Sequence, residues 1–446
     1  MRLTEGTPWK VILSFAMPIL LSQLFQQLYN TADTWIVGHY LGTESLAAVS
    51  SSGSLIFLLV SFFTGMSMGA GVVISRYFGA GDEGAVSRAV HTNVLLSLIS
   101  GLFLTVFGVI LTPHILEWMG TDPEVLPLST LYFRYYFLGS LALVMYNALK
   151  GVMSAVGDSR RPLYYLIFSS VLNVALDWLF VGALGLGVEW AAIATTIAQA
   201  ASALLCLLQL VKPGNVYTLR LKKLRIDPEL LKEILRNGLP SGVQNSVIGF
   251  ANVLVQTNIN SFAKQAMAAC GAYARIEGFA FLPVTSFSMA LTTFIGQNLG
   301  AKEYDRARAG ARFGITSSVI MAELIGVVIF LFGGFFISTF DDTPEVVAIG
   351  AQQCRTEALF FCLLSFSHCI AGICRGAGKA VVPMVIMLAI WCVLRIIYIT
   401  VAMSISHDIQ LLFIAYPLTW FISSVIYLIY YLKSDWIHGF EKGLQT

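Results

Sequence analysis

The chain has 446 residues, of which 57% are hydrophobic and only 12% are charged, and its formal net charge is +2. Soluble domains are usually about 45–50% apolar and about 25% charged, so this composition predicts a membrane protein. The small net charge gives no reason to expect nucleic-acid binding.

Twelve apolar runs, separated by charged or Gly/Pro-rich breaks, are long enough to cross a bilayer as helices, which takes about 20 residues each. The sequence therefore predicts an all-α polytopic membrane protein. The predicted spans are 11–36, 49–74, 91–111, 131–149, 162–181, 189–211, 240–262, 272–294, 313–337, 350–371, 381–404 and 410–432.

The basic residues are strongly biased toward one set of alternate connections. That set holds 22 of the 27 lysines and arginines, whereas the opposite set holds only Lys264. Because cytoplasmic loops are enriched in Lys and Arg, the bias predicts an even number of spans with both termini in the cytoplasm.

One long polar linker separates two groups of six spans. Its last part, "DPELLKEILRN", is typical of a short amphipathic helix with Asp227 as N-cap and Pro228 at the first helical position. We expect this helix to lie on the cytoplasmic surface. The predicted parts of the chain are an N-terminal six-helix lobe (1–211), the cytoplasmic linker (212–236), a C-terminal six-helix lobe (237–432) and a cytoplasmic tail (433–446).

The two halves of the chain resemble each other at a fixed offset. "KGVMSAVGDSRRP" corresponds to "AGICRGAGKAVVP" 221 residues later, and in the first span of each half an offset of 222 pairs Pro18 with Pro240 and Asn30 with Asn252. Because six spans return the chain to its starting side, we expect parallel copies related by a pseudo-two-fold axis along the membrane normal. Transporters commonly use such repeats, with the binding site between the halves.

A stripe of polar side chains runs along the first span, "LLSQLFQQLYNTADTWIV". Gln23, Gln27 and Asn30 fall on one face at 100° per residue, and Asp33 flanks this face. A charged side chain inside a membrane is costly, so Asp33 predicts a functional site. For the amides alone, hydrogen bonding between helices is an equally good interpretation.

Two later spans offer partners for Asp33. Asn173 and Asp177 lie one turn apart in the fifth span, and Thr195 lies at mid-depth in the sixth. Oxygen ligands suit a small cation, and two neighbouring buried carboxylates also favour binding of a proton. These four residues therefore predict a site for H⁺ or Na⁺, and their chemistry does not separate the two ions.

The second half of the chain keeps the amides of the first span but not its acid. Asn245, Asn252 and Gln256 form a stripe in the seventh span, where Val255 stands at the position equivalent to Asp33. We therefore expect ion coupling in the N-terminal half and substrate contacts from both halves. The predicted substrate-binding residues are Gln23, Gln27, Asn30, Asn245, Asn252, Gln256 and Glu277.

Two of the acids in later spans have candidate partners nearby in the sequence. Glu277 has two equally good interpretations, an ion pair with Arg275 or a position facing the central cavity. Glu357 is a further intramembrane acid, for which Arg355 is a candidate partner.

Four segments, "ADTWIVGHYLG", "SRYFGAGD", "GVMSAVGDSRRP" and "FIGQNLGA", resemble the multidrug and toxic compound extrusion (MATE) family, and the likeness extends over nearly the whole chain. It is to the bacterial NorM- and DinF-type cation-coupled antiporters, and it implies two six-helix bundles forming a V around a central cavity. The resemblance also implies that Asp33, Asn173, Asp177 and Thr195 correspond to the family's N-lobe cation site. Where some NorM-type members carry an acid in the seventh helix, this chain has Ile248.

These observations predict a secondary active antiporter of the bacterial inner membrane that exports bulky amphipathic or cationic organic compounds in exchange for H⁺ or Na⁺ by alternating access. We expect it to work as a monomer in the lipid bilayer, without a cofactor or a nucleic-acid partner. A lipid-linked precursor flippase of the wider superfamily is the alternative, although its cavity would often carry several basic residues. An enzyme is not expected, because the six histidines form no H-E-x-x-H pattern and no nucleophile motif accompanies them.

Overall fold

The computed structural model describes residues 2–118, 123 and 126–438, apart from the side chains of residues 43, 44, 46–48 and 50–55. Every regular element in this part of the chain is helical. The chain forms two compact units, each assembled from two segments. Unit 1 comprises Met1–Arg2 and Leu21–Gly242, and unit 2 comprises Leu3–Leu20 and Val243–Thr446.

Unit 1 contains most of the first six spans and the start of the seventh. The first element, α1 (Pro8–Ala80), consists of two helices joined at Gly42, whose φ of 81° and ψ of −174° are not helical. Glycine suits this position because it has no Cβ to oppose a positive φ. The elements that follow are α2 (Glu83–Trp118), α3 (Leu126–Leu138), α4 (Ser140–Ala155), α5 (Arg160–Asp177), η1 (Trp178–Ala183), α6 (Val188–Val211), η2 (Leu221–Lys223) and the beginning of α7 (Pro228–Ile259).

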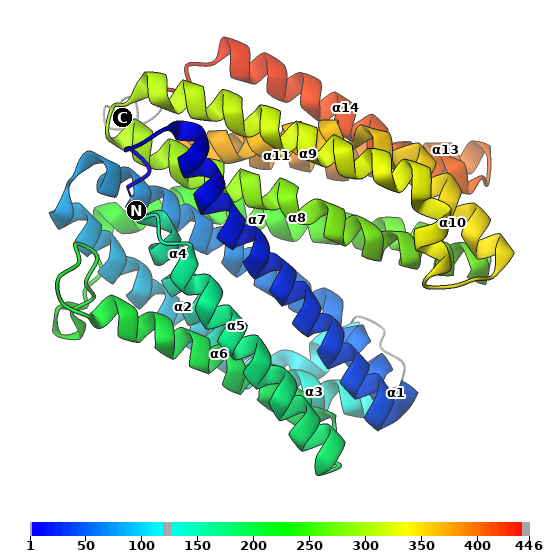
Figure 1. Cartoon of the computed structure of the whole chain (residues 1–446). Helices are drawn as coiled ribbons and strands as arrows, with labels where there is room; N and C mark the ends of the chain where they lie inside the picture. Colours follow the sequence, from blue (N-terminus) through cyan, green and yellow to red (C-terminus); the bar gives the residue numbers. More distant parts are fainter. Residues whose placement is uncertain (1, 119–122, 124–125, 439–446) are drawn as a thin grey trace. The chain divides into compact units, whose positions relative to one another are not determined.

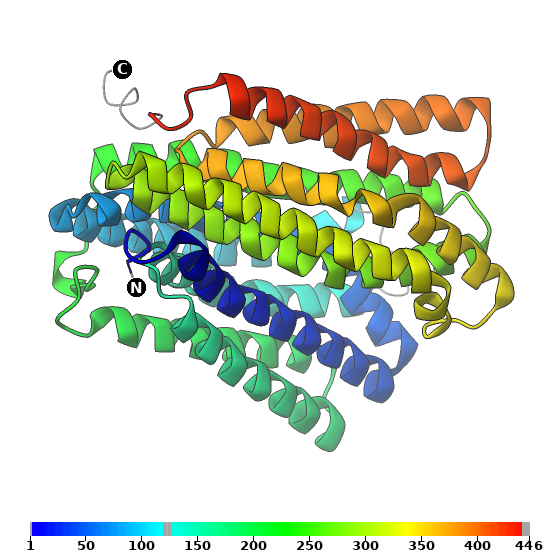
Figure 2. The same ribbon diagram turned by 45° about the horizontal axis from the view of Figure 1, so that its top comes forward.

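Unit 2 contains the rest of α7, all later helices and the first part of α1. Within this unit α8, α9 and α11 pack side by side, and α14 lies against α11 (Figures 1 and 2). The helices after α7 are α8 (Lys264–Gly300), α9 (Tyr304–Ser338), α10 (Pro344–Glu357), η3 (Ala358–Phe360), α11 (Phe361–Gly376), α12 (Val381–Met387), η4 (Leu388–Leu394), α13 (Arg395–Ile405) and α14 (Ile409–Lys433).

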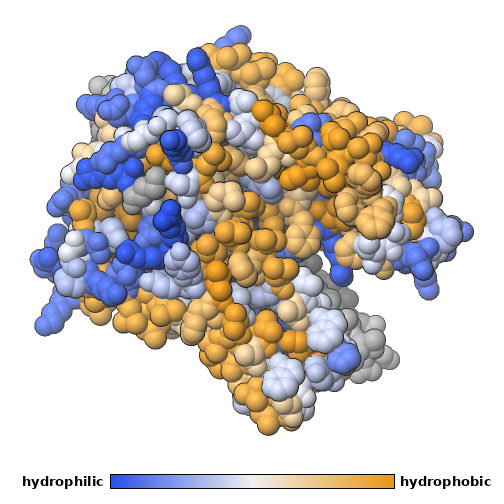
Figure 3. All heavy atoms as spheres, in the orientation of Figure 1, coloured by the Kyte–Doolittle hydropathy of each residue, from blue (hydrophilic) through white to orange (hydrophobic). Residues whose placement is uncertain are grey.

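The described helices account for the predicted spans. Ten of them are long and apolar enough to cross a membrane, and α3 with α4 makes an eleventh if that pair, bent by 46°, is one span. The remaining predicted span lies in α7, which has 32 residues but is less apolar because amides interrupt it. Figure 3 shows hydrophobic side chains covering much of the helical surface and hydrophilic ones gathered toward helix ends. The prediction of an all-α polytopic membrane protein is confirmed.

The first helix of each repeat half passes from one unit to the other. α1 leaves unit 2 after Leu20, and α7 leaves unit 1 after Gly242. These two points are 222 residues apart, which is the offset that pairs Pro18 with Pro240. The internal repeat therefore extends to the place where each helix changes its packing partners.

The start of α7 differs from the surface helix that the sequence predicts. Asp227 does cap it, because its Oδ1 accepts hydrogen bonds from the backbone N–H groups of Glu229 and Leu230 at 3.1 and 3.3 Å. The helix then continues without a break into the seventh span. Leu230 and Ile234 are buried in the apolar core of unit 1, so the prediction of a separate surface helix was wrong.

Glycines allow the start of α7 to pack closely on the second helix of α1. A Cβ built on Gly69 would lie 2.2 Å from the Cα of Gly238, and one on Gly65 would lie 2.4 Å from the backbone oxygen of Ser241. Side chains cannot occupy such short contacts, so both positions require glycine. Close approach of this kind is a common way for membrane helices to associate, and here it holds the start of α7 in unit 1.

Gly69→Ala is expected to destabilise the protein, because the new methyl group meets backbone that cannot move aside. Overpacking of this kind typically costs about 1–3 kcal/mol. The matched control is Gly271→Ala in α8, where nothing lies within 4 Å of the added Cβ and alanine is the better helix former. Thermal unfolding in detergent should therefore occur at a lower temperature for Gly69→Ala only. Equal unfolding temperatures for the two variants would contradict the close contact.

Candidate ion-binding site

The structure brings together the four residues predicted to bind an ion, and all four lie in unit 1. Asp33 comes from α1, Asn173 and Asp177 from α5, and Thr195 from α6. The carboxyl groups of Asp33 and Asp177 interact directly with each other. Asn173, one turn before Asp177, donates from Nδ2 to Thr195 Oγ1 at 3.4 Å.

Several oxygen atoms of this site are buried without a hydrogen-bond donor. Asn173 is 1% exposed and Asp177 is 0% exposed. Asn173 Oδ1, both carboxylate oxygens of Asp177 and Oδ1 of Asp33 have no donor among the described residues. Buried polar atoms are normally satisfied, so this group of oxygens fits a ligand that carries positive charge. Either Na⁺, which prefers hard oxygen ligands, or a proton shared by the two acids would fit.

The hydroxyl of Thr195 orients the amide of Asn173. Thr195 Oγ1 donates to the backbone oxygen of Ala191 at 3.1 Å, which leaves its lone pairs to accept from Asn173 Nδ2. Asn173 thus directs its donor group toward α6. Its carbonyl oxygen remains available as a ligand.

The helix changes its winding directly after the second acid. α5 ends at Asp177, and the next six residues form the π-helix η1. In this segment the backbone N–H of Leu184 donates to the oxygen of Leu179, five residues earlier, at 2.9 Å. Single π-helical turns occur frequently at functional sites, because they alter the direction of side chains on a regular helix.

Three tyrosines that the sequence analysis did not single out surround the acid pair. Tyr29 lies one turn before Asp33 in α1, and Tyr132 and Tyr136 lie one turn apart in α3. Each of them interacts electrostatically with Asp33. The spacing of Tyr29 and Asp33 was a signal that the sequence offered, since residues four apart share a helix face. Nothing local in the sequence indicates that α3 packs here.

The predicted amides of α1 are more accessible than the acid pair. Gln23 and Gln27 are half-buried and Asn30 is exposed, whereas Oδ1 of Asp33 is buried. All of them belong to unit 1. The amide stripe and the acid therefore have different surroundings, although they share one helix.

The predicted amides of α7 lie in the part of that helix that belongs to unit 2. Asn245 is half-buried, while Asn252 and Gln256 are exposed, and Gln256 Nε2 donates to Asn260 Oδ1 at 3.0 Å. Val255 is 2% exposed and packs in an apolar cluster. The position equivalent to Asp33 is thus part of the hydrophobic core of unit 2.

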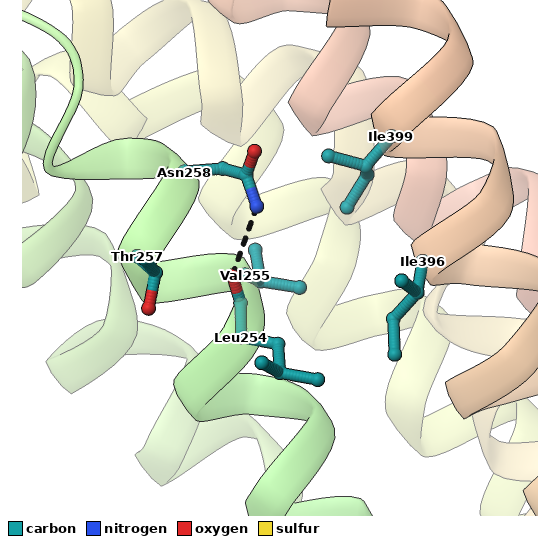
Figure 4. A pocket seen from close by; sticks show the side chains of 6 residues that line it. All are labelled: Leu254, Val255, Thr257, Asn258, Ile396 and Ile399. Carbon is teal, nitrogen blue, oxygen red and sulfur yellow. Dashed lines mark hydrogen bonds between the residues drawn. The ribbon is translucent and has the colours of Figure 1, made fainter.

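A small pocket lies beside this stripe, between α7 and α13 (Figure 4). Asn258 Nδ2 donates to the backbone oxygen of Leu254 at 3.0 Å, so the lining is mostly methyl groups. The volume is about 120 Å³, well below the roughly 300–1,000 Å³ of pockets that hold drug-sized molecules. Its lining residues are Leu254, Val255, Thr257, Asn258, Ile396 and Ile399.

Glu277 lies in α8, where it is half-buried, and its electrostatic partners are Arg395 and Glu357. Its sequence neighbour Arg275 is exposed. Arg355 is exposed as well, and the cation that interacts with Glu357 is Arg395.

Comparison with known proteins gives the family. The MatE sequence model matches residues 18–179 and again residues 240–401. The two matches cover more than half of the chain, and they are 222 residues apart, as the internal repeat requires. The chain belongs to the MATE family. The resemblance predicted from the sequence motifs is therefore confirmed.

Relatives of this MATE chain are similar over almost their whole length. YoeA of Bacillus subtilis, described as a probable multidrug resistance protein, is 30% identical over 441 residues, which cover 96% of this chain and 94% of YoeA. NorM of Thermotoga maritima, described in the same words, is 26% identical over 394 residues, which cover 86% of this chain and 83% of NorM. A solved outward-facing structure of a multidrug resistance MATE family transporter of the MOP superfamily has a TM-score of 0.91 at 23% identity, covering 99% of this chain and 98% of that one. The likeness shows that the two share a fold.

Thr195→Val is expected to destabilise the site without changing its shape, because the variant removes the acceptor of the Asn173 amide. Leaving a buried donor unpaired costs about 1–3 kcal/mol. The control is Thr196→Val, since the hydroxyl of Thr196 donates to the backbone oxygen of Ala192 at 2.9 Å and Asn173 does not contact it. Thermal unfolding of the purified variants should show the larger loss for Thr195→Val. A larger loss for Thr196→Val would contradict this role of the hydroxyl.

Proposed function

We propose that this chain is a secondary active antiporter that exports bulky amphipathic or cationic organic compounds in exchange for H⁺ or Na⁺. The observation that supports this most strongly is the buried Asp33–Asp177 pair, whose oxygens lack donors, in a chain of the MATE family. The names of the relatives YoeA and NorM, both described as probable multidrug resistance proteins, support the class of substrate. We further propose a bacterial inner-membrane protein that is a monomer with cytoplasmic termini.

The acid pair provides a physical basis for coupling. Two carboxylates in a poorly solvated site repel each other, and a bound proton or Na⁺ reduces their negative charge. Asp33 belongs to α1 and Asp177 to α5, so the charge of the pair changes the force between these helices. Ion binding then favours one arrangement of α1, and ion release favours another.

The first helix is suited to such a change. Pro18 lies inside α1, two residues before the point where the helix passes from unit 2 to unit 1. Proline removes one backbone hydrogen bond and permits a bend. We propose that α1 bends near Pro18 when the acid pair binds or releases its ion, and that this bend contributes to alternating access of the two lobes.

Substrate contacts are proposed for amides in both halves and for one acid. Amides both donate and accept hydrogen bonds, so they tolerate chemically diverse compounds. Asn30, Asn252 and Gln256 are exposed and therefore accessible to a ligand. The full proposed set is Gln23, Gln27, Asn30, Asn245, Asn252, Gln256 and Glu277.

Asp33→Asn is expected to abolish export while leaving the protein inserted in the membrane, because asparagine is similar in shape but binds neither H⁺ nor the charge of Na⁺ well. The control is Asp305→Asn, which removes a carboxylate that is 97% exposed and pairs with Arg308 on the surface. The measurement is dye efflux from liposomes containing the purified full chain. Retained efflux in Asp33→Asn, at the level of Asp305→Asn, would refute the coupling role.

The same liposomes identify the coupling ion when a pH gradient and a Na⁺ gradient are applied separately. Efflux driven by one gradient assigns the ion that the acid pair exchanges. If neither gradient drives efflux of any cationic dye while the protein is folded, the proposed antiport is wrong.

A further inference from the structure

Unit 2 contains a second group of buried charged side chains, which the proposed coupling site does not use. Glu277 comes from α8, Glu357 from the last residue of α10, and Arg395 from the first residue of α13. Arg395 interacts electrostatically with both glutamates, and the glutamates interact with each other. Three helices that are distant in sequence thus place two acids and one base together.

Glu357 is sealed inside this group. It is 0% exposed, and its Oε1 accepts a hydrogen bond from Gln353 Nε2 at 2.9 Å. Its second oxygen, Oε2, is buried and has no donor among the residues that the structure describes. A carboxylate that is fully ionised would leave this oxygen without compensation, and such a burial is costly.

Arg395 is held in place by neutral groups. It is 2% exposed, its Nη2 donates to Thr419 Oγ1 at 2.9 Å, and its guanidinium lies 4.5 Å from the ring centre of Tyr416 and 5.5 Å from that of Trp391. Cation–π contacts of this kind stabilise a charged guanidinium away from water. Nε of Arg395 is buried without an acceptor in the described part of the chain.

Neither glutamate forms a one-to-one ion pair with this arginine. All the ion pairs that the structure shows within 4 Å among the described residues lie elsewhere. Arg395 therefore acts on both carboxyl groups at longer range. Its single positive charge balances one of them and leaves the other uncompensated.

The remaining titratable groups around these three residues do not supply the missing charge. The nearby phenols and thiols are neutral at neutral pH. His368 contacts the ring of Trp391 edge-on at 5.4 Å, and its buried Nε2 has no partner in the described residues, so it adds no paired charge. The phenols and thiols in question are those of Tyr273, Tyr416, Cys270 and Cys354.

We propose that Glu277 and Glu357 bind one proton between them at neutral pH, with Arg395 balancing the remaining negative charge. This is a second proton site, in unit 2, and it is separate from the Asp33–Asp177 pair in unit 1. The proton makes the group of three electrically neutral, which removes the cost of an uncompensated buried carboxylate. Glu277 is only half-buried, so it is the member through which the proton exchanges with water.

The inference goes beyond the proposed antiport, because it requires neither a transported substrate nor a particular coupling ion. It changes what Glu277 is expected to do. A cationic compound that reached Glu277 would compete with the shared proton, so the site would respond to substrate by releasing H⁺. In that respect alone it rests on the proposed function.

Infrared spectroscopy of the purified full chain in lipid at neutral pH tests the proposal directly, because a protonated carboxyl group absorbs apart from a carboxylate. The background variant is Asp33→Asn with Asp177→Asn, which removes the acid pair of unit 1. We expect one protonated-carboxyl band to persist in this background. We expect the band to be lost when either Glu357→Gln or Glu277→Gln is added, and the second of these tests a half-buried position that tolerates change if the first fails to fold.

Glu323→Gln in the same background is the matched control. Glu323 is also a glutamate inside unit 2, and its Oε2 accepts from the backbone N–H of Cys362 at 3.2 Å, so it has a donor already. This control should leave the band unchanged. Absence of a protonated-carboxyl band in the background variant, or its persistence in both Glu277→Gln and Glu357→Gln, would overturn the proposal. Because nothing is transported in this experiment, its outcome is independent of whether efflux is coupled to H⁺ or Na⁺.

Discussion

The cost of burying a carboxylate away from water is the constraint on which the rest of this structure depends. A carboxylate that loses its hydration must gain donors, a cation or a proton, and otherwise its burial costs several kcal/mol. Asp177 and Glu357 are both completely buried, and each has at least one oxygen without a donor among the described residues. A fold that keeps such groups must therefore bind positive charge next to them. This requirement is what connects the helix packing of each unit with ion binding.

The two units meet this requirement in different ways. In unit 1, Asp33 and Asp177 are surrounded by oxygen atoms and tyrosines, so a mobile ion has to provide the positive charge. In unit 2, Arg395 provides a fixed positive charge beside two glutamates. The repeat mate of Asp33 is Val255, which packs in an apolar cluster. The acids of unit 2 thus occupy other positions than those of unit 1, and duplication of the fold did not duplicate the site.

The sequence predicted the residues of the unit 1 site but only part of their surroundings. Asn173 and Asp177 are one turn apart, and their spacing, together with the family motif, was sufficient to join them with Asp33 and Thr195. Tyr132 and Tyr136 were not found, because nothing in the sequence of α3 indicates which helix it packs against. Arg355 was the candidate partner of Glu357 because it is near in sequence, whereas the interacting cation, Arg395, comes from a helix that is about 40 residues away. Contacts within one helix follow from its period, while contacts between helices depend on packing that a single sequence does not show.

The same limit explains the fold of α7. The charged start of this helix suggested a surface position, but Gly65 and Gly69 of α1 let its backbone approach closely, and Leu230 and Ile234 become part of the core of unit 1. Because α7 then continues into unit 2, one rigid element has its two ends in different packing environments. α1 has the same property at the equivalent point of the repeat. A change in charge at Asp33 therefore acts on a helix that is anchored in both units, which is the physical requirement for an ion site in one unit to affect the other.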